Sequence, residues 1–447
     1  MVTSTQKSCS FAPNFICLRK IIVLVLLCTA GATSLRAQFL MDMLDTTKEA
    51  GKGLLGIYKK YDHLRIGGYI QPQYQAAPAN GTKSYEGGDF ATHVNNRFML
   101  RRSRVRIDYV HINNQQDPGV QIVFQFDANE RTFTVRDVWG RIFDNKLKLF
   151  SFTTGMFARP FGYEVNLSSS DRESPERGRM SQALMKSERD LGAMISLDAR
   201  KNYRILNHIK LEAGLFNGQG INATGDFDNK KDLIARAALK PLHLNKSATL
   251  TAGVSILQGG LLQNTKYVYT TNNSDKVVEV DSSASNIGTT SPRKYRGADI
   301  QLKIKNKFGY TELRAEYLAG TQTGTANSNE TPNALVSGRD GFYRRRFNGA
   351  YFYFLQNIFS SRHQLVLKYD WYDPNSRVAG QQITSAAKFT VADIKFSTLN
   401  IGYVYHITPV AKLVLFYAMV KNEKTGIAGY TSDVSDNIFT SRIQFRF

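Results

Sequence analysis

The chain has 447 residues, a formal net charge of +21 and a mean hydropathy of −0.32. Its three cysteines, Cys9, Cys17 and Cys28, all lie in the first 37 residues, which excludes a disulfide framework for the rest. Plentiful aromatics, 22 Tyr and 27 Phe, combined with this modest hydropathy suit a barrel with an apolar outer band, aromatic girdles and a polar lumen. A soluble β-sandwich is the alternative that composition alone leaves open.

Residues 1–37 have the pattern of a cleaved secretory signal peptide. Arg19 and Lys20 form a positive n-region, and an apolar stretch from Ile21 to Cys28 follows. A tolerable cleavage site, Leu35-Arg36-Ala37, precedes Gln38. The apolar stretch is too short for a spanning helix, which needs roughly 18 to 20 residues. A basic chain often binds nucleic acid or an anionic surface, but an exported chain does not meet nucleic acid. Small anions and anionic lipid headgroups are therefore its expected partners.

Residues 38–62 precede the first predicted strand and are expected to lie in the periplasm. Met41–Tyr58 could form a short amphipathic helix, with Leu44, Leu54 and Ile57 partly on one side. A disordered arm fits the same residues equally well.

Residues 63–447 contain many short segments in which apolar and polar side chains alternate, and none is apolar for the length of a spanning helix. This pattern is typical of a transmembrane, up-and-down antiparallel β-barrel, an all-β fold. The segments number about sixteen, an even number as single-chain bacterial barrels require. They are Leu64–Gln75, Phe98–Val110, Val120–Asp127, Thr132–Phe143, Leu147–Phe157, Asp190–Arg200, Ile205–Asn217, Asp232–Lys240, Ala248–Gln258, Tyr295–Lys305, Thr311–Thr321, Gly349–Ile358, His363–Tyr372, Asp393–His406, Ala411–Lys421 and Asn437–Phe447.

The connections between these segments alternate in length. The long ones are 76–97, 159–189, 259–294, 322–348, 373–392 and 422–436, and those between them are short, such as 144–146 and 359–362. Outer-membrane barrels place long loops outside and short turns in the periplasm, whereas a soluble sandwich has no reason to do so. The connection Ala128–Arg131 is an exception, because it is short where a long one is expected.

The last ten residues also favour a membrane barrel. Ile443, Phe445 and Phe447 fall on one face of an extended strand, and Arg442, Gln444 and Arg446 fall on the other. A final strand that ends in Phe resembles the signal read by the outer-membrane assembly machinery, which is therefore an expected partner. We expect the mature chain to be a multi-pass protein of the outer membrane, in contact with its lipid and lipopolysaccharide.

The second predicted strand carries a row of arginines. Period two places Arg102, Arg104 and Arg106 on one face, together with Asp108. Near the membrane midplane each arginine would cost roughly 2 to 4 kcal/mol in lipid, so this face must point into a wet lumen. Such a row can form a path for anions. It can also pair with lumenal carboxylates such as Asp108, Asp127 and Asp137, and both roles can hold at once.

The long connection after the fifth strand is a second candidate feature, with Arg159, Arg177 and Arg189 among its basic residues. It could fold into the barrel and narrow the pore, since Pro175 and Gly178 allow this, or it could be a solvated external loop. A further cluster, Arg344-Arg345-Arg346, precedes the twelfth predicted strand and is expected to face lipopolysaccharide or solvent.

The end of the fifth predicted strand reads Gly155-Met156-Phe157-Ala158-Arg159-Pro160-Phe161-Gly162-Tyr163-Glu164. This stretch resembles the G-x-F-x-x-P-F-G-x-E signature of the phosphate-selective porin O and P family. Further elements resemble that family's motifs in the same order and extend the resemblance over nearly the whole mature chain. They are Asn96-Arg97-Phe98 with Arg101-Arg102-Ser103-Arg104, Ser187-Glu188-Arg189-Asp190-Leu191-Gly192, Phe216-Asn217-Gly218-Gln219-Gly220, Asp228-Asn229-Lys230-Lys231-Asp232 and Tyr369-Asp370-Trp371-Tyr372-Asp373-Pro374-Asn375.

The resemblance implies a sixteen-stranded homotrimeric porin whose constriction is lined by arginines, a lysine and an aspartate. Arg101 and Arg102 would belong to that constriction, and Asp137 would be its acidic member. Ala158 stands where many members of the family have lysine. Strict alternation places Arg101 on the face opposite Arg102, unless the strand bends or bulges there.

These features predict a porin that passes small anions passively, with phosphate or polyphosphate as candidates, and that has no enzymatic activity, cofactor or metal. The seven histidines are scattered, and neither a nucleophile elbow nor a metal-spaced pair is present. An energised receptor needs a plug domain for which there is no room ahead of the barrel. An adhesin or a structural barrel without selective transport remains the alternative.

Overall fold

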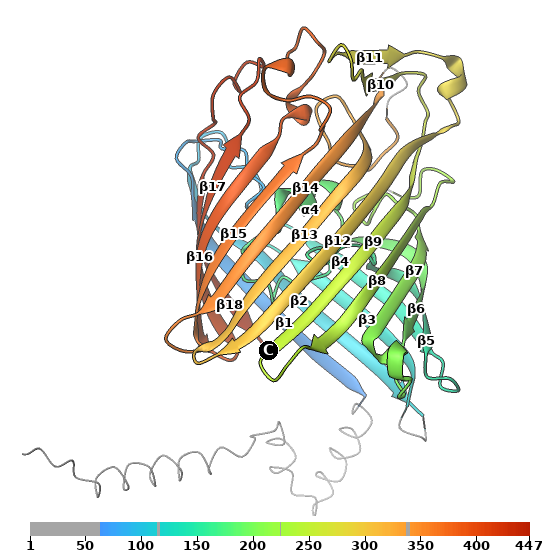
Figure 1. Cartoon of the computed structure of the whole chain (residues 1–447), viewed down its shortest axis with the longest axis vertical. Helices are drawn as coiled ribbons and strands as arrows, with labels where there is room; N and C mark the ends of the chain where they lie inside the picture. Colours follow the sequence, from blue (N-terminus) through green and yellow to red (C-terminus); the bar gives the residue numbers. More distant parts are fainter. Residues whose placement is uncertain (1–62, 114–116, 224, 337–339) are drawn as a thin grey trace, which may run out of the picture. The chain divides into compact units, whose positions relative to one another are not determined.

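Sixteen strands close into a barrel in the computed structural model, which describes residues 63–113, 117–223, 225–336 and 340–447 (Figure 1). The signal peptide expected at 1–37 and the segment 38–62 lie outside the described residues. The barrel strands are β1 (Leu64–Ala76), β2 (Asn96–Ile112), β3 (Pro118–Ala128), β4 (Phe133–Phe143), β5 (Phe150–Ala158), β6 (Arg189–Asp198), β7 (Ile209–Phe216), β8 (Asp232–His243), β9 (Ala248–Leu262), β12 (Thr290–Asn306), β13 (Gly309–Gly324), β14 (Phe342–Asn357), β15 (His363–Asp373), β16 (Phe396–Thr408), β17 (Ala411–Asn422) and β18 (Ile438–Arg446).

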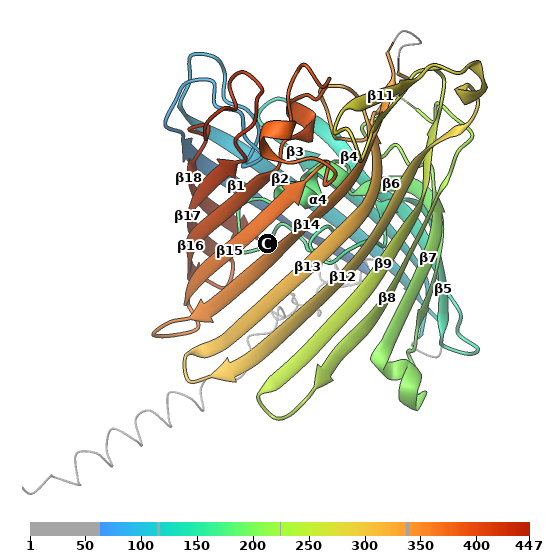
Figure 2. The same ribbon diagram turned by 45° about the horizontal axis from the view of Figure 1, so that its top comes forward.

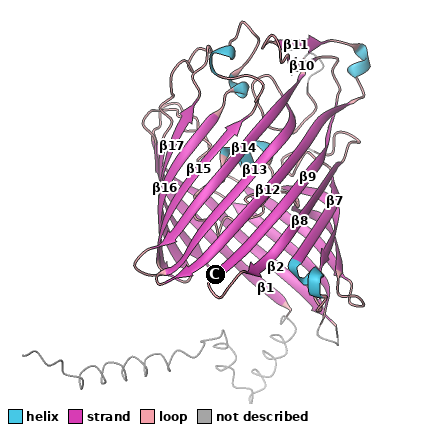
Figure 3. Ribbon diagram, in the orientation of Figure 1, coloured by secondary structure: helices cyan, strands magenta, loops and turns pink. Residues whose placement is uncertain are grey.

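The barrel closes because each strand pairs antiparallel with its neighbour in sequence and β1 pairs with both β2 and β18. The loop between β9 and β12 contains a small hairpin, β10 (Val268–Thr271) and β11 (Val278–Asp281), so β9 pairs directly with β12. Among the residues that the structure describes, strands dominate and the helical elements are a few short turns (Figure 3). The predicted closed, all-β, antiparallel barrel of sixteen strands is therefore confirmed.

The two faces of the barrel wall have opposite character. Outward side chains are apolar and exposed, for example Ile66 at 60% and Val254 at 57% exposure. Lumenal side chains such as Gln71, Arg293 and Asn400 are polar and almost fully buried within the barrel. This inside-out arrangement is that of a barrel whose exterior contacts lipid. Separately, none of the helices in the described residues is long and apolar enough to cross a membrane.

The long loops gather at one end of the barrel and the short turns at the other (Figures 1 and 2). The turn between β3 and β4 is the short exception at the long-loop end, as the sequence indicated. It is stabilised locally, because Asn129 Oδ1 accepts hydrogen bonds from the backbone N–H groups of Arg131 and Thr132 at 2.8 and 2.9 Å.

One long connection, residues 159–188, behaves differently from the others and is called the inner loop here. It carries the short helix α4 (Arg179–Leu184), which lies among the strands within the barrel (Figure 2). Phe161, Met180 and Leu184 of the inner loop belong to a buried apolar cluster with Tyr295 and Phe347 of the wall. The inner loop therefore has its own hydrophobic anchor on the β12–β15 side of the barrel.

Candidate functional site

Polar contacts attach the inner loop to the barrel wall along much of its length. Lys412 Nζ of β17 donates to the carbonyl oxygens of Ser170 and Arg172 at 2.9 and 3.1 Å. Glu173 accepts two hydrogen bonds from Arg314 of β13, at 2.7 and 3.0 Å. The bidentate Arg314–Glu173 pair fixes orientation as well as position. Of the two alternatives that the sequence left open, the inward fold is therefore correct.

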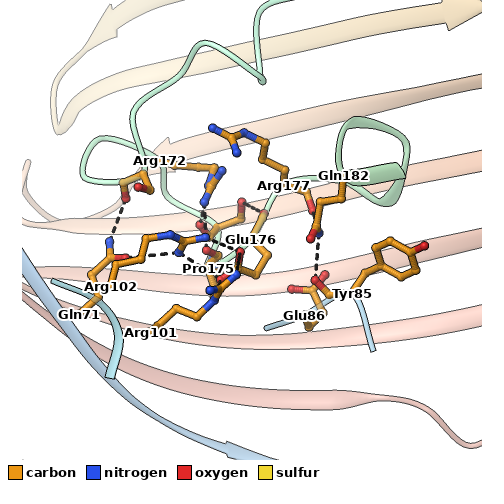
Figure 4. Close-up of polar contacts among 12 residues, drawn as sticks. Gln71, Tyr85, Glu86, Arg101, Arg102, Arg172, Pro175, Glu176, Arg177 and Gln182 are labelled. Atoms are coloured by element: carbon orange, nitrogen blue, oxygen red, sulfur yellow. Dashed lines mark hydrogen bonds and ion pairs between the residues drawn. The ribbon is translucent and has the colours of Figure 1, made fainter. Parts of the chain in front are cut away.

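Glu176 of the inner loop binds three arginines of the barrel wall. Its carboxylate receives Arg101 Nε at 2.8 Å, Arg102 Nη2 at 2.7 Å and Arg442 Nη2 at 3.0 Å. Figure 4 shows Arg101 and Arg102 converging on it from β2. Burial opposes the charged carboxylate, but Arg101, Arg102 and Arg442 outweigh burial and hold the pKa of Glu176 well below its ordinary value.

A β-bulge allows two adjacent arginines to reach the same carboxylate. Gln71 of β1 pairs with Arg102, but the next residue, Pro72, pairs with Leu100. Arg101 is therefore the extra residue of the bulge, so it turns inward beside Arg102 instead of facing lipid. This resolves the conflict between the alternation of the strand and the family resemblance.

A second bulge acts in the same way two strands further on. Gln125 of β3 pairs with Asp137 and Phe126 pairs with Val135, which leaves Arg136 as the extra residue of β4. Arg136 and Asp137 are both buried on the lumenal side. Each bulge thus adds one arginine to the lumen beyond what alternation would supply.

The lumen contains two large cavities, and residues of the inner loop line both of them. The loop-side cavity, about 1080 Å³, is lined by residues of the long loops and by Arg101, Arg102 and Glu176. The turn-side cavity, about 730 Å³, opens toward the short turns and includes Arg106 and Asp137. Among the described residues, only Arg104 and Arg177 line both cavities. These two arginines therefore mark the place where the cavities meet, which is called the throat here.

The throat is surrounded by a network of alternating charges. Arg104 pairs with Asp127 at 2.8 Å, and Arg177 pairs with Glu188 at 3.0 Å. Arg189 bridges Glu188 at 3.2 Å and Asp137 at 3.3 Å. With Arg136, which binds both Asp127 and Glu188, the network has four arginines and three carboxylates.

Three of these arginines keep Glu188, one of the acidic members of the network, charged. Burial acts against ionisation of Glu188, but Arg136, Arg177 and Arg189 prevail and hold its pKa well below the ordinary value. Glu188 therefore remains an anion at any physiological pH, and the network retains one positive charge in excess. A permeating anion would meet a positive but largely neutralised ring.

Both cavities are rich in basic residues, and the turn-side cavity has the larger excess. Its lining includes nine basic and four acidic residues, against eight and six for the loop-side cavity. Arg141 contributes to this excess, since no carboxylate of the described residues lies within ion-pair distance of it. Its Nε donates to Thr153 Oγ1 at 2.8 Å, and its guanidinium lies 5.0 Å from the ring of Trp139.

The candidate residues from the sequence are distributed over several places in the lumen. Arg101 and Arg102 bind Glu176, and Arg106 pairs with Asp108 at 2.7 Å in the turn-side cavity. Arg104, Asp137, Arg177 and Arg189 lie at the throat.

Arg159 is placed apart from the other candidates. It lines a third cavity of about 620 Å³ together with Arg293, and its nearest acidic partner is Asp190 at 3.8 Å. Burial, set against attraction from Asp190, lowers the pKa of Arg159. Ala158, the position of the family lysine, lines the turn-side cavity.

Sequence reasoning did not select several lumenal residues that the structure brings together. No spacing signal distinguishes Glu176 and Glu188 from the other carboxylates of the inner loop. Arg136 falls on the outward face of β4 by strict alternation with Asp137, and no sequence signal marks the bulge that turns it inward. The remaining members of this group are Arg141, Arg314, Lys412 and Arg442.

The predicted triple-arginine segment is divided between the two faces of the wall. Arg345 is buried and pairs with Asp393 at 2.8 Å, so it does not face lipopolysaccharide or bulk solvent. Arg344 Nε donates to Ser291 Oγ, and Arg346 is exposed on the outside. All three belong to β14, which begins earlier than the sequence predicted. The described residues contain no group of three or more histidine and acidic side chains placed to hold a metal.

A closed sixteen-stranded barrel with an apolar exterior and a loop folded into its lumen has the fold of a porin-like outer-membrane channel. The chain is similar to OprB of Pseudomonas putida in its high-pH structure, with 8% identity, coverage of 90% of this chain and 97% of that one, and a TM-score of 0.55. It is also similar to the outer membrane channel DcaP of Acinetobacter baumannii, with 11% identity, coverage of 86% and 97%, and a TM-score of 0.50. The same identity and TM-score relate it to an anion-selective porin from Comamonas acidovorans, with coverage of 86% and 99%.

These likenesses establish the fold alone, because the identities are low. No family model matches the chain, and no curated protein matches it. The resemblance to the phosphate-selective porin O and P family therefore stays a prediction.

Proposed function

We propose that this protein is an outer-membrane porin whose water-filled route passes the throat and prefers anions over cations. The observation that carries the proposal is the position of Arg104 and Arg177, which line both lumenal cavities. A solute that moves from one cavity to the other would pass these two guanidinium groups, which attract anions and repel cations.

Several moderate sites favour permeation over tight binding. The throat arginines are largely neutralised by Asp127, Asp137 and Glu188, so none offers a deep anion trap. Conduction requires sites that bind strongly enough to admit an ion and weakly enough to release it. A narrow, weakly positive ring between two basic cavities satisfies both requirements.

Phosphate and polyphosphate are the solutes that we propose as candidates, because guanidinium groups match phosphate oxygens bidentately. The anion selectivity stated for the Comamonas acidovorans porin supports an anion preference on this fold but is a property of that protein. We also propose, from the family resemblance, that the mature chain is a homotrimer inserted through its C-terminal Phe447, and chemical cross-linking in detergent tests the trimer.

The direct test is the reversal potential of the purified protein in a planar bilayer under a potassium chloride gradient. The wild-type potential should have the sign of chloride permeation. Arg104→Glu reverses the net charge of the throat and should move the potential toward cation permeation. Lys307→Glu is the matched control, since it makes the same charge change in an exposed turn outside both cavities and should leave the potential unchanged.

A cation-preferring wild type, or equal potentials for Arg104→Glu and wild type, would contradict the proposal. A folded barrel that shows no ohmic current steps would favour an adhesin or a structural barrel instead. Block of the chloride current by phosphate at lower concentration than by sulfate would support phosphate as a solute, and the reverse order would exclude a phosphate preference.

A further inference from the structure

The outer face of β12 and β14 carries positive charge at the long-loop end. Lys294 and Arg296 have the same parity along β12 as Ile300, an outward side chain with 49% exposure. Arg346 has the same parity along β14 as Phe352, which is outward with 48% exposure. All three cations are exposed and therefore project from the barrel wall toward its surroundings.

The three cations lie close together across neighbouring strands. In the register of the sheet, Lys294 lies opposite Thr321 of β13, and Thr321 lies opposite Arg346. Lys294 and Arg346 are thus two strand spacings apart, about 10 Å. Arg296 is one outward position further along β12. These three residues are called the basic row here.

The basic row has no acidic partner within the described part of the chain, where no carboxylate lies within ion-pair distance of any of its members. The outward carboxylate of Asp373, which lies in register with Asn348, makes no ion pair with Arg346. This contrasts with the lumen, where most arginines are paired. An unpaired set of three outward cations is suited to an external anion.

Aromatic residues place the basic row at the level of the lipid headgroups. Tyr317 and Trp371 face outward directly below it, in one row of the sheet with Ala298 and Ala350. Exposed Tyr and Trp mark the interface between hydrocarbon and headgroups. An outward Lys or Arg costs about 0 to 1 kcal/mol at that depth, but several times more at the midplane.

An apolar groove of about 500 Å³ lies on the same strands, nearer the short turns. Its outward lining side chains include Ile300, Leu302, Leu313, Ala315, Phe352 and Leu367. Four to six residues separate the basic row from the groove, which is roughly 13 to 20 Å along the strands. In the row of the sheet between the two, Ala298 of β12 is exposed beside Tyr317, so the outward face carries no large side chain along β12 at that level.

We propose that this face binds a phosphorylated, acylated lipid of the lipid A type from the outer leaflet. Its phosphate groups would lie on the basic row, and one acyl chain would follow β12 past Ala298 into the groove. Positive charge above and an apolar groove below match the two ends of such a lipid. A second copy of this chain is the rival occupant, but it would need outward acidic residues to match the basic row. The proposal does not depend on the selectivity of the channel.

Native mass spectrometry of the full-length barrel in detergent tests the proposal, with bisphosphorylated lipid A as the probe and phosphatidylethanolamine as the lipid of neutral headgroup. Wild type should retain lipid A in preference to phosphatidylethanolamine. The double variant Lys294→Glu with Arg346→Glu should bind lipid A at least about tenfold more weakly, because attraction at two positions becomes repulsion. Lys421→Glu is the matched control, because Lys421 is an exposed cation of β17 outside the basic row, and it should bind as wild type does.

A second variant tests the groove without altering charge. Ala315→Trp should fill the groove and weaken lipid A binding while the barrel keeps its heat-modifiable migration. Equal retention of both lipids by wild type would overturn the proposal, as would undiminished lipid A binding by both variants. A change in oligomeric mass with unchanged lipid A binding would assign the face to contacts between copies and would also overturn it. Displacement of lipid A by millimolar inorganic phosphate would point to a free-phosphate site and reject the lipid.

Discussion

Arg102 Nη2 donates to Glu176 Oε2 at 2.7 Å, although the two residues belong to a barrel strand and to the centre of a long loop. This contact, joined by Arg101 and Arg442, holds the inner loop across the lumen. Glu176, Arg101 and Arg102 line the loop-side cavity, which shares Arg104 and Arg177 with the turn-side cavity. We therefore expect the width of the proposed route to depend on how firmly Glu176 is bound.

Removal of the Glu176 charge should release the inner loop. Glu176→Gln keeps the size of the side chain but leaves Arg101, Arg102 and Arg442 without their carboxylate. Removal of one partner of a buried ion pair typically destabilises a structure by about 3 to 5 kcal/mol. Single-channel conductance should rise because the loop no longer narrows the lumen. Bilayer recordings of single channels measure this directly.

Asp171→Asn in the same loop is the control for that variant. Asp171 pairs with Arg446 at 3.0 Å, but both side chains are about half exposed, so the pair is worth only about 0 to 1 kcal/mol. Conductance should stay at the wild-type value. A similar rise in single-channel conductance in both variants would mean that the contacts of Glu176 do not specifically hold the inner loop in place.

The loop between β1 and β2 should lose stability as pH rises from about 4 to about 7. Burial, assisted by Glu176 and Asp370 and opposed by Lys368, raises the pKa of Glu86 to about 7. Since the unfolded carboxyl ionises near pH 4.3 while the folded one stays protonated up to about pH 7, ionisation favours the unfolded loop, and the folded loop loses stability over that interval. Glu86→Gln should stabilise the loop at pH 8 by up to about 3 kcal/mol and have little effect at pH 4.

Hydrogen–deuterium exchange of residues 77–95 measures this pH dependence. Slower exchange in Glu86→Gln at pH 8, after correction for the intrinsic rate, is the expected result. The same protection in variant and wild type at both pH values would show that Glu86 does not carry the effect.

Gly155 and Gly140 lie on paired strands, and we expect their substitution by alanine to affect the stability of the barrel differently. Gly155 of β5 has a φ of +121°, and an added Cβ would lie 2.4 Å from the carbonyl oxygen of Val138. Gly155→Ala should therefore destabilise the barrel by at least about 1 to 3 kcal/mol. Gly140 of β4 has open space at its Cβ position, so Gly140→Ala should be nearly neutral.

The temperature at which each variant loses its compact migration in detergent gel electrophoresis compares the two glycines. Gly155→Ala should unfold at a lower temperature than wild type, and Gly140→Ala should not. Equal midpoints for both would mean that the backbone at Gly155 relaxes without cost.

The wall of the barrel could be predicted from the sequence because each strand repeats one simple rule. Because lipid lies outside the barrel and water inside it, apolar and polar side chains alternate along every strand. All sixteen barrel strands therefore overlap their predicted segments. Loop lengths added independent support, including the short exception between β3 and β4. Strand ends were less accurate, as in β14, which begins at Phe342 instead of Gly349.

The throat could not be predicted in the same way because it depends on exceptions to that rule. Bulges at Arg101 and Arg136 place two adjacent residues on the lumenal face. Pro72 in the first strand was a usable signal for the first bulge, since proline cannot donate a ladder hydrogen bond. The inward path of the inner loop depends on Glu173 and Glu176 meeting Arg314 and Arg102, contacts between residues far apart in sequence.

The central claim is that permeating anions pass Arg104. The most direct test places either a positive or a negative charge at that position in the same variant and compares the ion selectivity. In the variant Arg104→Cys the introduced thiol is the only one after residue 37, because the chain has no other cysteine there, so a thiol reagent modifies this position alone. Reversal potentials in a potassium chloride gradient would be recorded before and after modification by a positively charged methanethiosulfonate reagent and, separately, by a negatively charged one. The positive adduct should restore the anion preference of the wild type, and the negative adduct should abolish or invert it. Identical potentials after both reagents, with modification verified by mass, would contradict passage of anions through the throat.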